Sequence, residues 1–175
     1  MQLWGGNSEI DNGVSLAGID CWVYSRPFQS AASSHSNAGA AGNAAVSSAS
    51  SSGGGDIHFV TSCATGRITR LVVADVSGHG APVAEMATSL RRLMRRHANH
   101  YDQRLFVRSV NERFSELMSP GSAPDSAVFA TAVFASFHAP TDEFSLCNAG
   151  HPRPLHYDAR RAQWLDGIAL QALTP

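Results

Sequence analysis

Several features are scarce or missing in this 175-residue chain. It contains no lysine, since all 13 basic residues are arginines, and 14 acidic residues bring its formal net charge to −1. Without an excess of positive charge, a chain lacks the broad attraction that draws proteins to nucleic acid or to anionic membranes. Neither is therefore expected as a partner.

Cysteine is also scarce, because Cys21, Cys63 and Cys147 lie far apart and form no CxxC pair. Secreted scaffolds use many cysteines in even numbers, so three distant thiols favour a cytoplasmic location. The cysteines and histidines also lack zinc-ligand spacing, which argues against a zinc site. No apolar run approaches the ~20 residues of a membrane span, and no signal-peptide pattern opens the sequence.

The length of the chain suits a single domain with one core, and its composition predicts an insertion within that domain. Residues 1–13 are polar and glycine-rich, and we expect a loose lead-in there. Residues 29–52 are almost only serine, alanine, glycine and asparagine. Such a segment cannot bury enough apolar surface to offset its ordering entropy, so it is predicted to be a disordered insertion. The domain itself is predicted to cover 14–175.

The pattern of apolar residues predicts an α+β fold. Strands are expected over 14–28, 57–63, 68–76, 127–138, 143–147, 153–157 and 162–165, and helices from Pro82 onward and over 102–118. The turn 64–67 should join two of the strands as a hairpin. Asp102 suits the N-cap of the second helix.

The stretch 68–99 organises the chain. The apolar run 71–74 is typical of a buried strand, Asp75 follows at its end, and the segment 77–80 supplies a glycine-permitted turn. Pro82 then suits the first turn of a helix, where its missing N–H costs nothing. A carboxylate between a strand end and a helix start can be held rigidly and still meet solvent. Such a position suits the binding of a hard cation or chemistry on a phosphate group.

Asp56 and Asp75 are predicted to converge on one edge of the sheet. Asp56 comes at the start of one strand of the hairpin and Asp75 at the end of the other, and these ends are adjacent in an antiparallel pair. Two simpler interpretations remain open. Asp75 could cap the following turn or helix, and Asp56 could merely close the insertion.

Three segments resemble the signature of SpoIIE-like phosphatases, a bacterial branch of the metal-dependent (PPM-type) serine/threonine protein phosphatases. They are 54–56 (GGD), 74–82 (ADVSGHGAP) and 148–155 (NAGHPRPL), in the family's order. The resemblance covers about 14–170. It implies an αββα sandwich with two central helices and antiparallel strands, truncated at its C-terminal end.

The resemblance also implies a metal site. The residue matching Asp75 bridges two Mn²⁺ or Mg²⁺ ions and is the catalytic residue, Asp56 is a further metal ligand, and Val76 adds its backbone carbonyl. Water between two such ions is a good nucleophile, so phosphoserine or phosphothreonine would be hydrolysed without a covalent phospho-enzyme. The implied substrate is a regulatory phosphoprotein, such as an anti-sigma factor antagonist. The family's later aspartates fall beyond this sequence, and neither Asp142 nor Asp166 substitutes for them.

Other polar residues carry weaker signals. His79 is offset from the histidine of related phosphatases, so it receives no catalytic role, and a turn or a phosphate-side role fits it equally well. His151 suits a loop residue bonded to backbone. The arginines of 91–96 are typical of a solvated helix face. The alternative function is a non-catalytic module of the same fold that binds a regulatory partner.

Overall fold

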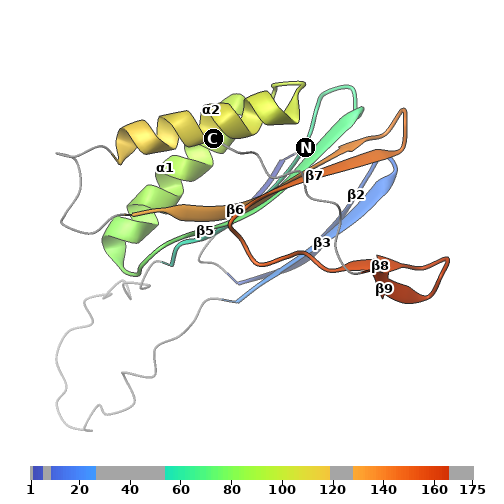
Figure 1. Cartoon of the computed structure of the whole chain (residues 1–175), viewed down its shortest axis with the longest axis horizontal. Helices are drawn as coiled ribbons and strands as arrows, with labels where there is room; N and C mark the ends of the chain where they lie inside the picture. The colour runs from blue at the N-terminus through green and yellow to red at the C-terminus, as the bar shows by residue number, and fades with distance from the viewer. Residues whose placement is uncertain (1, 6–8, 27–53, 119–127, 166–175) are drawn as a thin grey trace, which may run out of the picture.

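The computed structural model describes residues 2–5, 9–26, 54–118 and 128–165 (Figure 1). The insertion predicted over 29–52 and the residues 166–175 lie outside this part, so the predicted domain boundaries stay predictions. No helix among the described residues is long and apolar enough to cross a membrane.

The described residues form strands and two helices in the order strands, helices, strands, which confirms the α+β class. The strands are β1 (Gln2–Gly5), β2 (Ile10–Leu16), β3 (Ile19–Ser25), β4 (Asp56–Ser62), β5 (Ile68–Val76), β6 (Ala130–His138), β7 (Glu143–Ala149), β8 (His156–Asp158) and β9 (Gln163–Leu165). The helices are α1 (Ala81–His97) and α2 (Gln103–Leu117).

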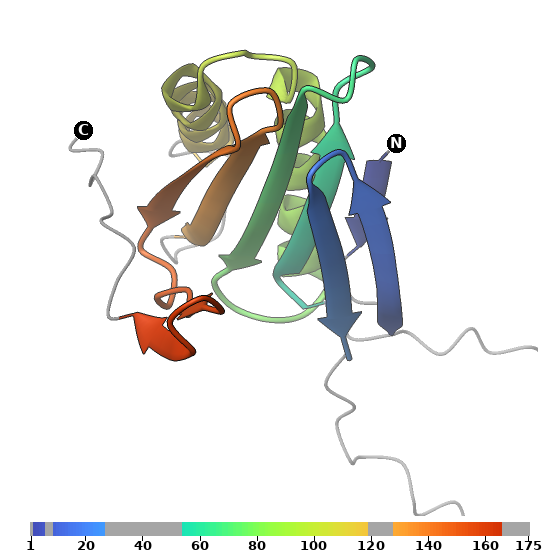
Figure 2. The ribbon, with the colours of Figure 1, turned by 90° about the vertical axis from the view of Figure 1, so that its right-hand side faces the viewer.

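Five strands form the main sheet in the order β1-β4-β5-β6-β7, and every neighbouring pair is antiparallel. Helices α1 and α2 lie against one face of the sheet, and the β2–β3 hairpin lies on the opposite face (Figures 1 and 2). A separate hairpin, β8–β9, follows β7. The molecule therefore has a helical layer, a sheet and a partial third layer.

Two differences from the sequence-based expectations fall near the N-terminus. The single strand expected over 14–28 is instead the β2–β3 hairpin, because Gly18 adopts a φ of 76° and turns the chain between Leu16 and Ile19. The loose lead-in expected over 1–13 is wrong for much of that segment. Its first residues pair with β4 as β1, and β2 already begins at Ile10.

Each of the two helices buries one apolar face against the sheet. The main core lies between them and the sheet and contains Ile57, Phe59, Val72, Ala74, Val76, Val83, Ala87, Leu90, Met94, Phe106, Val107, Val110, Phe114, Ala132, Phe134 and Cys147. Phe106 meets Phe134 edge to face at 5.5 Å between ring centroids, a favourable aromatic geometry. Asp102 caps α2 as predicted, because its carboxylate accepts a hydrogen bond of 2.7 Å from the Arg104 N–H.

Arg70 ties the connection between the helices to the sheet. It lies on the helix-facing side of β5, and the residue is only 2 % exposed. Its guanidinium donates to the carbonyl oxygens of Ala98, His100 and Tyr101 and to the Ser136 hydroxyl. It also stacks over the Phe106 ring at 4.9 Å. These contacts satisfy a buried charge and carbonyl groups that would otherwise lack partners.

The β2–β3 hairpin covers only part of the other sheet face. Val14 and Cys21 pack with Val60 of β4. The turn at Gly18 lies so close to the Phe137 ring that a Cβ there would approach it to 2.8 Å. Phe137 pairs with the start of β5, at the end remote from Asp75. Near Asp75 the face is more open, and Val73 is 51 % exposed.

Candidate functional site

The three segments that resemble phosphatase motifs meet at one edge of the main sheet. Because neighbouring strands are antiparallel, β4 and β6 start where β5 and β7 end. Asp56 lies at the start of β4, Asp75 near the end of β5, Thr131 near the start of β6, and the segment 148–151 at the end of β7. We call this the carboxylate edge; it is the lower edge of the sheet in Figure 2.

The two predicted carboxylates stand directly opposite each other. Asp56 pairs with Asp75 in the β4–β5 register, as the hairpin predicted. Side chains opposite each other share one face of a sheet. That face is turned away from the helices, because the alternate residues Ala74 and Val76 belong to the core beneath them. Both aspartates are exposed to solvent.

Gly55 allows oxygen atoms of β5 to approach the β4 backbone closely. Its carbonyl accepts a hydrogen bond of 3.1 Å from the Val76 N–H. A Cβ on Gly55 would lie 2.0 Å from the Val76 carbonyl oxygen and 2.9 Å from Oδ1 of Asp75. Any larger residue would collide with the strand, so the glycine before Asp56 has a steric reason. The Val76 carbonyl and the Asp75 carboxylate thus converge beside the same glycine.

The electrostatic setting of Asp75 also favours a cation. Partial burial and, secondarily, the Asp56 carboxylate raise the pKa of Asp75 above its ordinary value, whereas His151 acts in the opposite direction. Two carboxylates facing each other repel, and a positive ion between them would relieve the repulsion.

The oxygen atoms present fit a hard divalent cation. Two carboxylates and one carbonyl are its preferred ligand types, and Mg²⁺ commonly keeps several waters and takes only one or two protein carboxylates. No group of three or more His, Cys, Asp or Glu side chains with metal-binding geometry occurs in the part of the chain that the structure describes. Asp56, Asp75 and Val76 therefore fit one hydrated ion better than a fully enclosed ion.

The turn after Asp75 is built from glycines and a serine. Gly78 and Gly80 adopt φ values of 105° and 89°, and Gly80 is the N-cap of α1. Ser77 fixes the turn to the segment before β6, since its N–H donates to the Phe129 carbonyl and its hydroxyl accepts from the Phe129 N–H. His79 is exposed within this turn. Among the described residues, no hydrogen bond or ion pair joins His79 to Asp56 or Asp75.

His151 lies beside the carboxylates and is held in a bonded turn. The Asn148 side chain donates to the His151 carbonyl and accepts from its N–H, both at 2.8 Å. Nδ1 of the His151 ring lies 2.9 Å from the Thr131 hydroxyl. Thr131 in turn stands directly opposite Asp75 in the β5–β6 register. The His151 ring thus bonds to a side chain, that of Thr131, whereas the His151 backbone is held by the Asn148 side chain.

Thr131 is the residue of this site that the sequence analysis missed. It sits inside an apolar strand without motif or turn around it, so no local signal marks it. Its position next to Asp75 follows only from the pairing of β5 with β6. Asn148 belongs to the recognised NAGHP segment, and an asparagine before a glycine turn is a signal for side-chain bonding to backbone.

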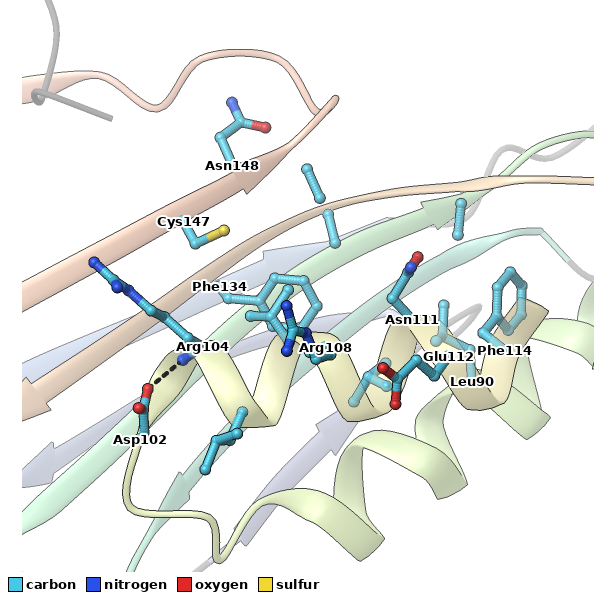
Figure 3. A pocket seen from close by; sticks show the side chains of 16 residues that line it. Leu90, Asp102, Arg104, Arg108, Asn111, Glu112, Phe114, Phe134, Cys147 and Asn148 are labelled. Atoms are coloured by element: carbon cyan, nitrogen blue, oxygen red, sulfur yellow. Dashed lines mark hydrogen bonds between the residues drawn. The ribbon is translucent and has the colours of Figure 1, made fainter. Parts of the chain in front are cut away.

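A separate groove lies on the helical side of the sheet. It has a volume of ≈ 820 Å³ between α2 and the strands β6 and β7, and its lining includes Phe134, Cys147, Arg108 and Glu112 (Figure 3). Cys147 points toward α2, whereas its neighbour Asn148 projects from β7 away from the helix (Figure 3). The groove and the carboxylates are therefore on opposite faces, and the groove is not the cavity that would hold the reacting phosphate.

The comparisons agree with the arrangement of these motifs. The sequence model of the family described as "Stage II sporulation protein E (SpoIIE)" matches residues 65–172. The chain belongs to the SpoIIE family. This match includes Asp75, Thr131 and His151, whereas Asp56 lies just before it.

A solved structure supports the fold. It is "the crystal structure of the RsbU and RsbW domains of Rv1364c from Mycobacterium tuberculosis", with 28 % sequence identity and a TM-score of 0.54. The similarity covers 70 % of this chain and 33 % of the other, so this SpoIIE-family chain spans about a third of that protein. Among curated proteins, none matches the chain.

Proposed function

We propose that this SpoIIE-family chain hydrolyses phosphoserine or phosphothreonine in a regulatory protein with the help of Mn²⁺ or Mg²⁺. The observation that carries the proposal is the pairing of Asp56 with Asp75 at the edge where the GGD, ADVSGHG and NAGHP segments meet. Asp56, Asp75 and the Val76 carbonyl are the proposed metal ligands. Asp75 is the residue on which activity depends most.

The proposed mechanism assigns a simple role to each group. A bound divalent ion would supply an activated water and stabilise negative charge on the phosphoryl oxygens. The two carboxylates would hold that ion on the face turned away from the helices, where a phosphorylated side chain of another protein could reach it. Gly55 keeps the β4 backbone out of the space that the Val76 and Asp75 oxygens need. No cysteine or serine nucleophile is required.

The substrate class is proposed from the family and its neighbour. The solved relative carries RsbU and RsbW domains in one chain. A signalling phosphatase of this family would act on a phosphoprotein of a regulatory switch, such as an antagonist of an anti-sigma factor. A cytoplasmic location follows from such a substrate.

The direct test measures phosphate release from a phosphoserine-containing antagonist protein with Mn²⁺ and with chelator. We expect release only with Mn²⁺ and a large loss in the Asp75→Asn variant. Asp142→Asn is the matched control, because Asp142 lies in the β6–β7 turn at the opposite edge and its φ of 54° suits asparagine. Release that survives chelation, or that is equal in the two variants, would contradict the proposal.

The groove beside α2 favours a second candidate, a non-catalytic module that binds its regulatory partner there. Its apolar floor and charged rim are features of recognition sites for other chains. This candidate predicts that the phosphoprotein binds equally well with chelator and in the Asp75→Ala variant, while no phosphate is released under any metal condition.

A further inference from the structure

His151 is fixed more firmly than a turn requires. The turn itself is closed by the two hydrogen bonds between Asn148 and the His151 backbone, and Gly150 supplies the positive φ of 73°. These contacts would hold the backbone with any side chain at position 151. The further hydrogen bond between the Thr131 hydroxyl and Nδ1 acts only on the imidazole ring. It fixes the orientation of a side chain whose rotation would otherwise be free at the half-buried surface.

The fixed ring stands beside the proposed reaction centre. Thr131 is the cross-strand neighbour of Asp75, so one residue connects the ring to the position opposite the carboxylate. A phosphoryl group that approaches Asp75 would therefore approach the imidazole as well.

The bond to Thr131 leaves the other ring nitrogen available. When the hydroxyl donates to Nδ1, the neutral ring carries its proton on Nε2, and a protonated ring carries a proton there too. Within the described part of the chain, no residue forms a hydrogen bond with Nε2 of His151. In this arrangement the ring presents an Nε2–H donor in either protonation state.

We propose that His151 binds the phosphoryl group of the substrate through Nε2–H, and that Thr131 and Asn148 are its positioning residues. This inference rests on the proposed phosphatase function and deepens it. The hydrogen bond to a phosphoryl oxygen anchors the group beside the carboxylates and opposes its negative charge. Such preorganised donors are effective because they need no reorientation when the substrate arrives.

Two substitutions at the same position separate binding from structure. In His151→Asn the amide can replace Nδ1 and keep the bond to Thr131, but nothing replaces Nε2. In His151→Gln the amide can replace Nε2 but not the bond to Thr131. We expect His151→Asn to fold with unchanged melting temperature. We also expect it to raise the inhibition constant of inorganic phosphate and KM roughly ten- to hundredfold, the usual value of a hydrogen bond to a charged group.

His151→Gln should show the opposite pattern: its melting temperature should fall, and its inhibition constant for inorganic phosphate should stay close to the wild-type value. Thr131→Val should weaken phosphate binding less than His151→Asn does, and Thr131→Ser should restore the wild-type value because it keeps the hydroxyl. If His151→Asn and His151→Gln lose stability alike and leave phosphate inhibition unchanged, His151 is a structural residue and the inference is wrong.

An NMR measurement tests the inference even if no turnover is found. The ¹⁵N shifts of the His151 ring report which nitrogen carries the proton, and we expect the Nε2–H form in the wild type and a mixture in Thr131→Val. Addition of inorganic phosphate with Mg²⁺ should shift the Nε2 resonance of the wild-type chain. An unmoved ring resonance overturns the inference. If it coincides with metal-dependent hydrolysis, the proposed function still stands.

Discussion

Asp56 and Asp75 stand opposite each other in the β4–β5 ladder, on the face of the sheet turned away from α1 and α2. Like charges in this relationship destabilise a strand pair. The register is nevertheless fixed, because Ile57, Ala74 and Val76 are buried on the other face and a slip of one residue would expose them. The apolar core thus holds two mutually repelling carboxylates together, and a cation can convert that repulsion into binding.

Replacing Asp75 with asparagine should therefore separate metal binding from folding. Without metal, Asp75→Asn should melt at or above the wild-type temperature, because the repulsion from Asp56 is removed. Mn²⁺ should raise the melting temperature of the wild type, since a ligand stabilises the folded state that binds it, and should not affect the variant. Differential scanning calorimetry with chelator and with Mn²⁺ measures both effects. Equal stabilisation of the two chains by Mn²⁺ would show that other residues bind the ion.

Gly55→Ala should disrupt the same site through the backbone. The added Cβ would lie 2.0 Å from the Val76 carbonyl oxygen, so the strands must shift and the Asp75 carboxylate with them. We expect lower thermal stability and loss of the Mn²⁺ response. Gly66→Ala is the matched control: its φ of 70° also disfavours alanine, but the nearest described atom to its Cβ would be that of Ala17, at an ordinary 3.9 Å. That control should lose stability and keep the Mn²⁺ response; loss of the response in both chains would mean that the effect at Gly55 is not local.

Local sequence patterns were sufficient to predict much of the fold around Asp56 and Asp75. The strands β4 and β5 are joined by a short glycine turn, so their boundaries and the meeting of Asp56 with Asp75 followed from the sequence. The cap at Asp102 and the positions of both helices followed from composition and spacing. Each of these features depends on residues that are close in the chain.

Features that depend on distant pairings were not predictable in this way. Thr131 reaches Asp75 only because β6 returns to β5 after two helices, and no local pattern sets that register. The strand β1 is short, and its partner β4 lies beyond the 29–52 segment. No local pattern marks β1, and the polar, glycine-rich composition of residues 1–13 suggested a loose segment instead. The β2–β3 hairpin was missed because Gly18 lies inside an otherwise continuous alternation of apolar residues.

The Arg70 contacts predict a strong dependence of stability on the guanidinium. In Arg70→Lys the ammonium is a point donor and cannot bond to three carbonyl groups and the Ser136 hydroxyl at once. We expect a loss of about 2–4 kcal/mol in the free energy of unfolding, because buried carbonyls are left without partners. Urea titration followed by circular dichroism measures the loss. Arg92→Lys, at an exposed position of α1, should change stability by less than about 0.5 kcal/mol. Similar values for the two variants would contradict this role of Arg70.

Cys63 should be the reactive thiol of the chain. Burial raises its pKa, but hydrogen bonds from the Thr65 hydroxyl and from backbone N–H groups, including that of Ile68, outweigh burial and lower the pKa to about 7. Cys21 and Cys147 are buried, and burial raises the pKa of each. Alkylation with iodoacetamide, followed by mass spectrometry, should therefore modify Cys63 first, with a half-maximal rate near pH 7.

The same hydrogen bonds determine how the Cys63 thiolate affects stability. Its pKa is lower in the folded chain than the ordinary 9.0, so the thiolate stabilises the fold fully above pH 9.0. This contribution falls as the pH drops toward about 7 and is absent below it. Thr65→Val removes the hydroxyl that contacts the sulfur, so its alkylation midpoint should move upward toward 9.0. The stability of Thr65→Val relative to wild type should also decrease as the pH rises through this range. A midpoint that stays near 7 in the variant would mean that the backbone N–H groups alone hold the thiolate.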